Sequence, residues 1–147
     1  MSMRSYAPRD PHWETRVRES FAKQGAMASL GARITALNPG ECTIELPFRP
    51  ELAQQHGFFH AGILSAIADS AGGYAGYTLF PARTEVLTVE FKINFVAPAE
   101  GDALTASAHV IRAGRTLTVT SANVHVRRAG RDSLCALMQQ TLIALSD

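Results

Sequence analysis

The residues best suited to do chemistry lie together in one apolar stretch of the chain, residues 54–73. This stretch contains a single carboxylate, Asp69, and no lysine or arginine. Because burying an isolated charge is costly, Asp69 either reaches water or has a function. A carboxylate in such a setting can act as a nucleophile or as a general base for water.

The same stretch predicts a helix from about residue 60 to residue 79, ending before Pro81. His60-Ala61-Gly62 opens this helix, and the first turn of a helix has free N–H groups and a dipole that favours negative charge. The amides of Ala61 and Gly62 are therefore candidate donors to an oxyanion. Glycines at 62, 72, 73 and 76 each cost up to about 1 kcal/mol of helix stability. We therefore expect a curved sheet to wrap the helix and approach its backbone closely.

The elements that must position this helix follow from hydrophobic spacing. An N-terminal helix is predicted from His12 to about Leu30, with Asp10 as its N-cap, and a loop from Pro50 to Phe59. Strands are predicted on both sides of the turn at residues 38–40, the second at residues 42–48, and at 85–97, 103–112, 116–127 and 133–145. This order predicts an α+β fold with an antiparallel sheet, in which residues 1–30 form an arm and helix and residues 31–147 form one domain.

Bulk properties exclude several classes of function. The chain has 147 residues, 46% hydrophobic and 18% charged, with a formal net charge of +1, which is typical of an ordinary globular domain. This charge gives no general attraction to nucleic acid or membrane. Cys42 and Cys135 lack metal-site spacing and are expected to be buried, reduced thiols. Because no signal peptide or membrane-spanning run is evident, we expect a cytoplasmic protein.

A resemblance to a known family sharpens the interpretation. A glycine-rich helix wrapped by an antiparallel sheet resembles the hotdog fold. His60-Ala61-Gly62 followed by Ala68-Asp69 resembles the His-Gly-Gly…Ala-Asp signature of the PaaI-like acyl-CoA thioesterases. The run from Val89 to Ala99 is similar to the central strand of that family, and the resemblance covers about residues 30–145.

The resemblance implies roles for individual residues. Asp69 matches the catalytic carboxylate, and the backbone N–H of Ala61 matches the oxyanion donor, although glycine is usual at that position. Gln54 matches the residue that positions the thioester or the water, and Thr88 matches a residue that holds the water. Strand alternation puts Leu87, Val89, Phe91, Ile93 and Phe95 on one face and Thr88 on the other, so Thr88 needs a bulge or an exposed pocket wall to reach the pocket.

Other residues are candidates for contacts with the substrate. His60 either contacts the substrate or caps the helix, and His56 and Phe58 either line an acyl pocket or pack the loop. Coenzyme A carries phosphates that arginine binds well. Arg112 and Arg115 flank one hairpin turn and are candidates for this role, as is the second set at the next turn, Arg127, Arg128 and Arg131.

The spacing of Ala61 and Asp69 has a consequence for assembly. Eight residues of helix rise by about 12 Å, so one thioester carbonyl cannot contact both residues of the same chain. If both act on one carbonyl, they come from different subunits, and the site lies at a two-fold interface. We therefore expect a homo-oligomer, either a dimer or a dimer of dimers.

The leading hypothesis is hydrolysis of acyl-CoA to a free acid and CoA, without a metal or redox cofactor. A second hypothesis is a hotdog hydratase or dehydratase, in which His60 and Asp69 pair across subunits for proton transfer. A third is a non-enzymatic module that binds acyl-CoA. The identity of the acyl group stays open, and an aromatic or medium-chain group fits a pocket lined by an apolar helix.

Overall fold

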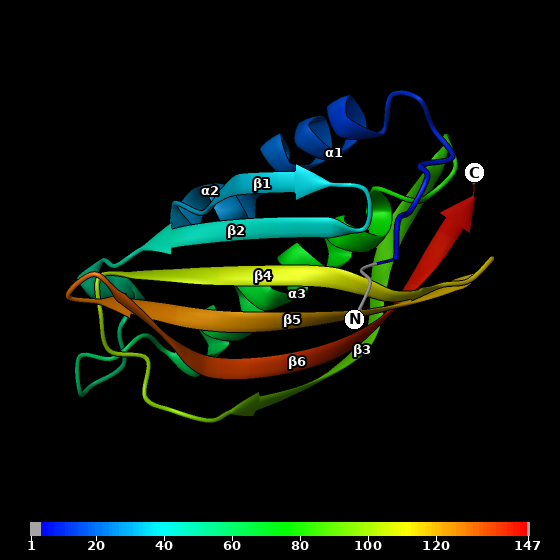
Figure 1. Cartoon of the computed structure of the whole chain (residues 1–147). Helices are drawn as coiled ribbons and strands as arrows, with labels where there is room; N and C mark the ends of the chain where they lie inside the picture. Colours follow the sequence, from blue (N-terminus) through cyan, green and yellow to red (C-terminus); the bar gives the residue numbers. More distant parts are fainter. Residues whose placement is uncertain (1–3, 147) are drawn as a thin grey trace.

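A curved antiparallel sheet encloses one long helix, α3 (Ala61–Tyr77) (Figure 1). The computed structural model describes residues 4–146, so residues 1–3 of the predicted arm and residue 147 of the predicted domain lie outside it. Its six strands follow the order β1-β2-β4-β5-β6-β3, and every neighbouring pair is antiparallel. Their bounds are β1 Arg33–Asn38, β2 Glu41–Pro47, β3 Thr84–Phe95, β4 Ala103–Ala113, β5 Leu117–Arg128 and β6 Arg131–Ser146. The predicted α+β architecture is confirmed.

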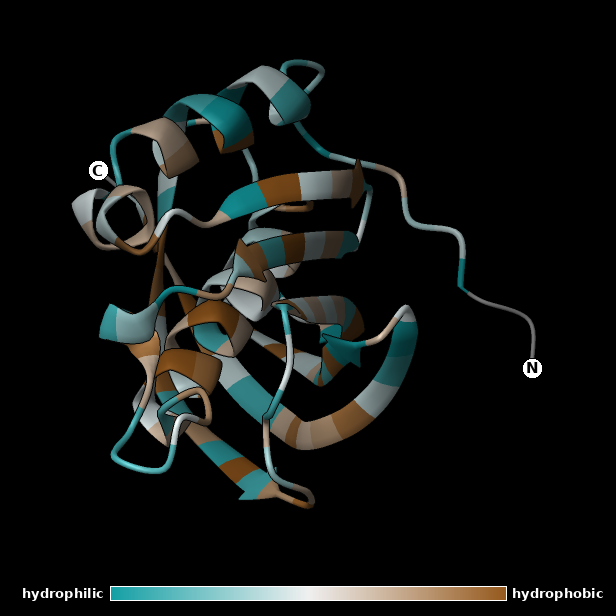
Figure 2. Ribbon diagram, turned by 90° about the vertical axis from the view of Figure 1, so that its left-hand side faces the viewer, coloured by the Kyte–Doolittle hydropathy of each residue, from teal (hydrophilic) through white to brown (hydrophobic). Residues whose placement is uncertain are grey.

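Helix α3 is buried along most of its length, as its apolar composition requires. Figure 2 shows the apolar residues of this helix inside the curve of the sheet, while polar and apolar residues alternate along the strands. Two of its glycines permit close packing on the sheet. A Cβ at Gly72 would overlap the side-chain oxygen of Gln140, and one at Gly76 would overlap Leu142. The prediction that glycines allow close backbone approach is therefore confirmed at these two positions.

Strand β3 lies at the edge of the sheet and contains a β-bulge. The register with β6 shifts between Thr88 and Glu90, so Val89 is the extra residue. The bulge changes which residues face the helix: Thr88 faces inward before it, and Phe91, paired with buried Gln140, faces inward after it. The predicted single stripe from Leu87 to Phe95 is therefore wrong, because Leu87 and Val89 point outward and are 56% exposed. The bulge provides the route by which Thr88 reaches the helix.

The N-terminal segment forms two helices, α1 (Trp13–Ala22) and α2 (Gly25–Leu30), rather than the one predicted. The helix breaks because the backbone of Gln24 is extended and Gly25 follows it. The prediction of Asp10 as the N-cap is wrong, because α1 begins at Trp13 and its N-cap is His12; the Asp10 carboxylate instead accepts a hydrogen bond from the His12 N–H at 2.9 Å. The division of the chain at residues 30 and 31 stays a prediction.

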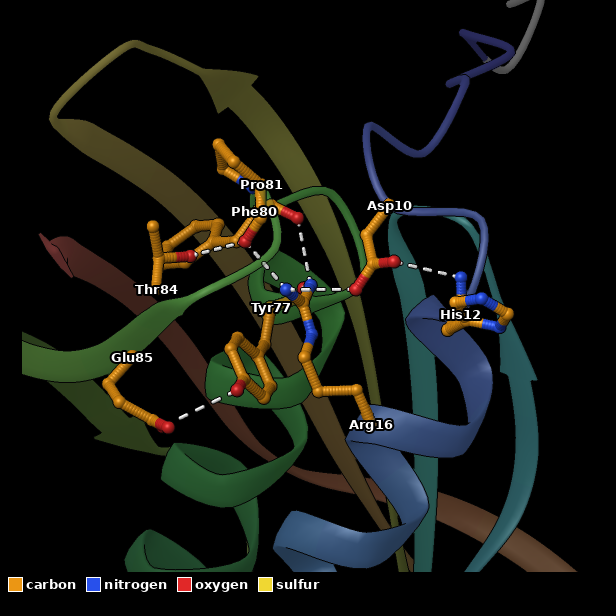
Figure 3. A network of polar contacts seen from close by, with 8 residues as sticks. All are labelled: Asp10, His12, Arg16, Tyr77, Phe80, Pro81, Thr84 and Glu85. Atoms are coloured by element: carbon orange, nitrogen blue, oxygen red, sulfur yellow. Dashed lines mark hydrogen bonds and ion pairs between the residues drawn. The ribbon is translucent and has the colours of Figure 1, made fainter. Parts of the chain in front are cut away.

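An arginine fixes α1 to the far end of α3. Arg16 donates to the carbonyl oxygens of Tyr77, Phe80 and Pro81 at 2.6–3.0 Å, and its guanidinium lies 4.5 Å from the centre of the Tyr77 ring. It also forms an ion pair with buried Asp10 at 3.2 Å. Figure 3 shows these contacts meeting at the end of the helix. A cation at a helix C-terminus is electrostatically favourable, so this contact stabilises the packing of α1 on α3.

A short 3-10 helix, η1 (Pro50–Leu52), leads into the loop before α3. Cys42 and Cys135 are buried and reduced, which confirms the prediction, and burial raises their pKa values to about 12 and about 11. None of the helices in residues 4–146 has the length and apolar character needed to cross a membrane.

Candidate active site

The Asp69 carboxylate is held by two side chains of the sheet. Thr88 Oγ1 of β3 donates to Asp69 Oδ1 at 2.7 Å, and Gln140 Nε2 of β6 donates to the same oxygen. Gln140 Nε2 also lies 3.2 Å from the Asp69 carbonyl oxygen and 3.0 Å from Thr88 Oγ1. Within residues 4–146, Asp69 Oδ2 has no hydrogen-bond partner. One carboxylate oxygen is therefore fixed, and the other is available to react.

Gln140 is a site residue that the sequence reasoning missed. Its side chain is completely buried, and Thr120 Oγ1 donates to its Oε1 at 3.0 Å, which leaves its Nε2 to donate to Asp69. Gly72 makes room for this arrangement, because a Cβ there would also lie 2.8 Å from Thr120 Oγ1. One sequence feature could have identified Gln140. It occupies an inward-facing position of a strand, between the buried apolar residues Met138 and Leu142.

A cavity of about 350 Å³ opens beside Asp69. Its lining residues come from α1 and the segment after it, from α3 and from β3: Ser20, Gln24, Asp69, Ser70, Gly73, Tyr74, Glu85, Val86, Leu87 and Thr88. A larger cavity of about 540 Å³ lies between the N-terminal arm at Tyr6 and strands β2, β4 and β5. The larger cavity contains none of the predicted site residues, so the smaller one is the candidate substrate pocket.

The start of α3 presents one unused amide. His60 is the N-cap, and its Nδ1 accepts a hydrogen bond from Gly62 N–H at 2.9 Å, which leaves the proton on Nε2. The Ile63 N–H donates to the His60 carbonyl oxygen at 2.9 Å. The N–H of exposed Ala61 has no acceptor among the described residues. Of the two amides predicted as oxyanion donors, Ala61 is thus available, whereas Gly62 is engaged in the cap.

The loop before α3 is held by Gln54. Its side-chain oxygen accepts hydrogen bonds from the backbone N–H groups of His56 and Phe58, so it fixes the turn while its amide nitrogen stays available. His56 is exposed, Phe58 is half-buried, and neither lines the cavity beside Asp69. Phe59 is buried against Phe48, with ring centres 5.1 Å apart, and therefore packs the loop.

Within one chain, the structure brings together some of the predicted residues and separates others. Thr88 contacts Asp69, whereas Ala61 lies at the start of α3, about 12 Å away along the helix by its rise per residue, and His60 and Gln54 precede Ala61 in the chain. The candidate site in one chain therefore consists of two separate halves.

The candidate arginines occupy two ends of the sheet. Arg112 and Arg115 lie near the β4–β5 turn, and Arg115 lines a small cavity with Phe80 at the far end of α3. Neither forms an ion pair within residues 4–146. By contrast, Arg127 and Arg128, at the β5–β6 turn, pair with carboxylates. Across the described residues, no group of three or more His, Cys, Asp or Glu side chains could hold a metal ion.

Comparisons with known proteins agree with this architecture. Residues 56–134 match the sequence model of the thioesterase superfamily. A crystal structure of a thioesterase family protein from Silicibacter pomeroyi is 48% identical, with a TM-score of 0.91 over 92% of this chain and 99% of that one. The PaaI protein of the E. coli phenylacetic acid degradation operon is 20% identical and shares the fold, with a TM-score of 0.82 over 91% of this chain and 94% of that one.

Among curated proteins, a proposed esterase of Saccharolobus solfataricus is 33% identical over 61% of this chain, and the match spans 64% of that protein. A proposed esterase of Halobacterium salinarum is 30% identical over 68% of this chain and 69% of that protein. The match to the superfamily model covers more than half of the chain, including α3 and β3, which carry Asp69 and Thr88. The chain therefore belongs to the thioesterase superfamily and has the hotdog fold.

Proposed function

We propose that this protein hydrolyses acyl-CoA thioesters to a free acid and CoA. The observation that carries the proposal is the Asp69 carboxylate, which is held through Oδ1 while Oδ2 is left available at a cavity. An oriented carboxylate beside an open cavity is suited to activate water or to attack a carbonyl. Membership of the thioesterase superfamily makes a thioester the expected substrate.

The reaction needs a base, an oxyanion donor and a leaving group. In the general-base route, Asp69 Oδ2 takes a proton from water, and the water oxygen attacks the thioester carbon. The carbonyl oxygen becomes an oxyanion, which the Ala61 N–H at a helix start stabilises. Collapse of this intermediate breaks the C–S bond and releases CoA, whose thiolate takes up a proton. In the alternative route, Asp69 attacks the thioester carbon directly, the C–S bond breaks and CoA leaves as its thiolate, and water then hydrolyses the mixed anhydride to the free acid and the Asp69 carboxylate.

We propose that the two halves of the site come from different subunits. Edge strand β3 supports this proposal, because it is long and carries exposed apolar side chains, with Phe91 41% and Phe95 47% exposed on the inward face. An uncovered edge of this kind is a template for pairing with another strand. Pairing of β3 with a second copy would cover these side chains and bring the start of one α3 toward Asp69 of the other.

Other predicted residues keep proposed roles around this centre. The Thr88 hydroxyl orients the carboxylate, His60 presents an Nε2–H to the substrate, and the Gln54 amide positions the thioester or the water. Arg112 and Arg115 bind the CoA phosphates, a role supported by their exposure and by the absence of ion pairs to them within residues 4–146.

The test is release of free thiol from a panel of acyl-CoAs by the wild type and by Asp69→Asn, which keeps the size of the side chain. We expect the wild type to release thiol and the variant to lose at least about a hundredfold in kcat, while it still binds acyl-CoA. Hydration of an enoyl-CoA without release of thiol, or the absence of turnover with every substrate of the panel, would contradict the proposal. Single-turnover hydrolysis in oxygen-18 water separates the two routes, because only anhydride hydrolysis can label Asp69.

A further inference from the structure

A chain of hydrogen bonds runs across the sheet and ends at Asp69. It begins at Thr120 of β5, passes through Gln140 of β6 and ends at the carboxylate, beside Thr88 of β3. These strands are neighbours in the order β5-β6-β3 (Figure 1), and Thr120 and Gln140 pair directly across the β5–β6 ladder. A residue of β5 is thereby connected to the carboxylate that we propose reacts.

The two residues at the start of this chain do not reach the candidate substrate pocket. Thr120 and Gln140 are both completely buried, and neither lines the cavity beside Asp69. Thr88 and Asp69, by contrast, both line it. Any effect of Thr120 on catalysis must therefore pass through the side chain of Gln140 and the orientation of Asp69.

The hydrogens of this chain all point toward Asp69. The Thr120 hydroxyl donates to Gln140 Oε1 at 3.0 Å, and Gln140 Nε2 donates to Asp69 Oδ1 and, at 3.2 Å, to the Asp69 carbonyl oxygen. The Thr88 hydroxyl, which lies 3.0 Å from Gln140 Nε2, donates to the same Oδ1 at 2.7 Å. An ionised carboxylate only accepts hydrogen bonds. The chain therefore serves Asp69 only while Nε2, and not Oε1, of the Gln140 amide faces it.

The other end of the Gln140 amide depends on Thr120. Within residues 4–146, the Thr120 hydroxyl is the only hydrogen-bond donor to Gln140 Oε1. Helix α3 has no side chain at this point, because Oε1 lies against Gly72. A buried amide oxygen without a donor is costly.

Loss of the Thr120 hydroxyl would leave no satisfactory orientation for this amide. With Nε2 on Asp69, Oε1 would be buried without a donor. With the amide turned over, Oε1 would face the Asp69 carboxylate, and Nε2 would face position 120 without an acceptor. Gln140 would therefore shift and hold Asp69 less firmly.

We infer that Thr120 is a positioning residue for the hydrolysis. By donating to Gln140 Oε1, it keeps Gln140 Nε2 on Asp69, and it thereby contributes to the rate of turnover and not to the binding of substrate. The inference rests on the proposed function, because that function makes Asp69 the reacting group.

The test compares Thr120→Val, which replaces the hydroxyl with a methyl group, with Thr120→Ser, which keeps the hydroxyl. Release of free thiol over a range of acyl-CoA concentrations gives kcat and KM for each variant. We expect Thr120→Val to lower kcat about tenfold with KM unchanged, and Thr120→Ser to stay within about twofold of the wild type.

A double-mutant cycle shows whether Thr120 acts through Gln140. Gln140→Met, which keeps the length of the side chain but has no amide, should lower kcat about a hundredfold. In that background Thr120→Val should have no further effect on kcat, because the connection to Asp69 is already lost. Losses that multiply in the double variant would overturn the inference.

The matched control is Thr118→Val, the same chemical change two residues earlier on the inward face of β5. Thr118 is also buried, but it pairs with Leu142 and packs beside Gly76. This variant should therefore keep the kcat of the wild type. An equal loss of kcat in both valine variants would show an effect of packing alone and would overturn the inference.

NMR of the Gln140 side-chain amide gives a readout that does not depend on turnover. Its signals are identified by their loss in Gln140→Met. Their hydrogens should exchange with water at least about tenfold faster in Thr120→Val than in the wild type or Thr118→Val, and an unchanged exchange rate would overturn the inference. Faster exchange in Thr120→Val, in a protein whose wild type hydrolyses no acyl-CoA, would refute the proposed function alone.

Discussion

Replacing two neighbouring glycines of α3 with alanine, one at a time, should have opposite effects. Alanine is better than glycine inside a helix by about 1 kcal/mol. At Gly73 the added methyl group enters open space, so Gly73→Ala should stabilise the protein by about 1 kcal/mol and raise its Tm by about 3 °C. The methyl group also narrows the cavity, so turnover of the bulkiest acyl-CoAs should fall while that of the shortest is retained.

At Gly72 a steric overlap outweighs the same gain in helix stability. The new Cβ overlaps Gln140 Oε1 and lies 2.8 Å from Thr120 Oγ1, so Gln140 has to move. Its bonds to Thr120, Asp69 and Thr88 contribute about 1 kcal/mol each, so after the helix gain the net loss is about 2 kcal/mol, or about 6 °C in Tm. Asp69 also loses its orientation, and kcat should fall by about a hundredfold.

The assays for this pair are thermal unfolding followed by circular dichroism and release of free thiol from a short acyl-CoA. Each variant is the matched control for the other, because both make the same chemical change at adjacent positions of one helix. If both variants unfolded at the same temperature and hydrolysed the short substrate equally fast, then neither Gln140 nor its contact with Gly72 would position Asp69, and the reasoning would be refuted.

Three further predictions concern the rest of the molecule. Arg16→Met should destabilise the protein by about 3 kcal/mol in urea unfolding, because it removes the cation that pairs with the buried Asp10 carboxylate and that donates to three carbonyl groups. A loss below about 0.5 kcal/mol would mean that the contact does not anchor α1. Arg112→Ala/Arg115→Ala should raise the KM for acyl-CoA but not for acyl-pantetheine, which lacks phosphate, and an equal rise for both would contradict phosphate binding. Burial raises the pKa values of Cys42 and Cys135 from 9.0 to about 12 and about 11. Above pH 9 the unfolded chain therefore binds fewer protons than the folded protein, and the free energy of unfolding falls by about 1.4 kcal/mol per pH unit for each thiol. Replacing both cysteines with alanine should flatten this slope in urea unfolding measured from pH 8 to pH 10, and an unchanged slope would contradict it.

Most of the fold could be predicted because local patterns determine it. Turn residues and alternating apolar positions located the strand predicted at 103–112, which is observed as Ala103–Ala113, and the helix predicted from about residue 60 to 79, observed as Ala61–Tyr77. Strand alternation also indicated that Thr88 needs a bulge or an exposed pocket wall to reach the pocket, and the structure has the bulge. These features depend on spacing along one segment of the chain.

The features that could not be predicted depend on contacts between distant segments. The bulge at Val89 is a property of the pairing of β3 with β6, and the break at Gln24 places a side chain against α3. In the sequence, Gln140 is a single polar residue in a predicted strand. Its role becomes apparent only when the fold brings this strand against Gly72 of α3. The sequence therefore singled out Asp69 and Thr88 but not Gln140, the second side chain that holds the carboxylate.

The most direct test of a site shared between subunits is complementation between two inactive variants. Asp69→Asn removes the carboxylate, and Ala61→Pro removes the proposed oxyanion donor. Proline is well tolerated at this first helical position, and the extended backbone of His60 suits a residue before proline. When the two variants are unfolded and refolded together in equal amounts, half of the dimers are mixed, and each mixed dimer has one intact site. The account predicts recovery of about a quarter of wild-type activity, whereas a mixture as inactive as either variant alone would contradict it.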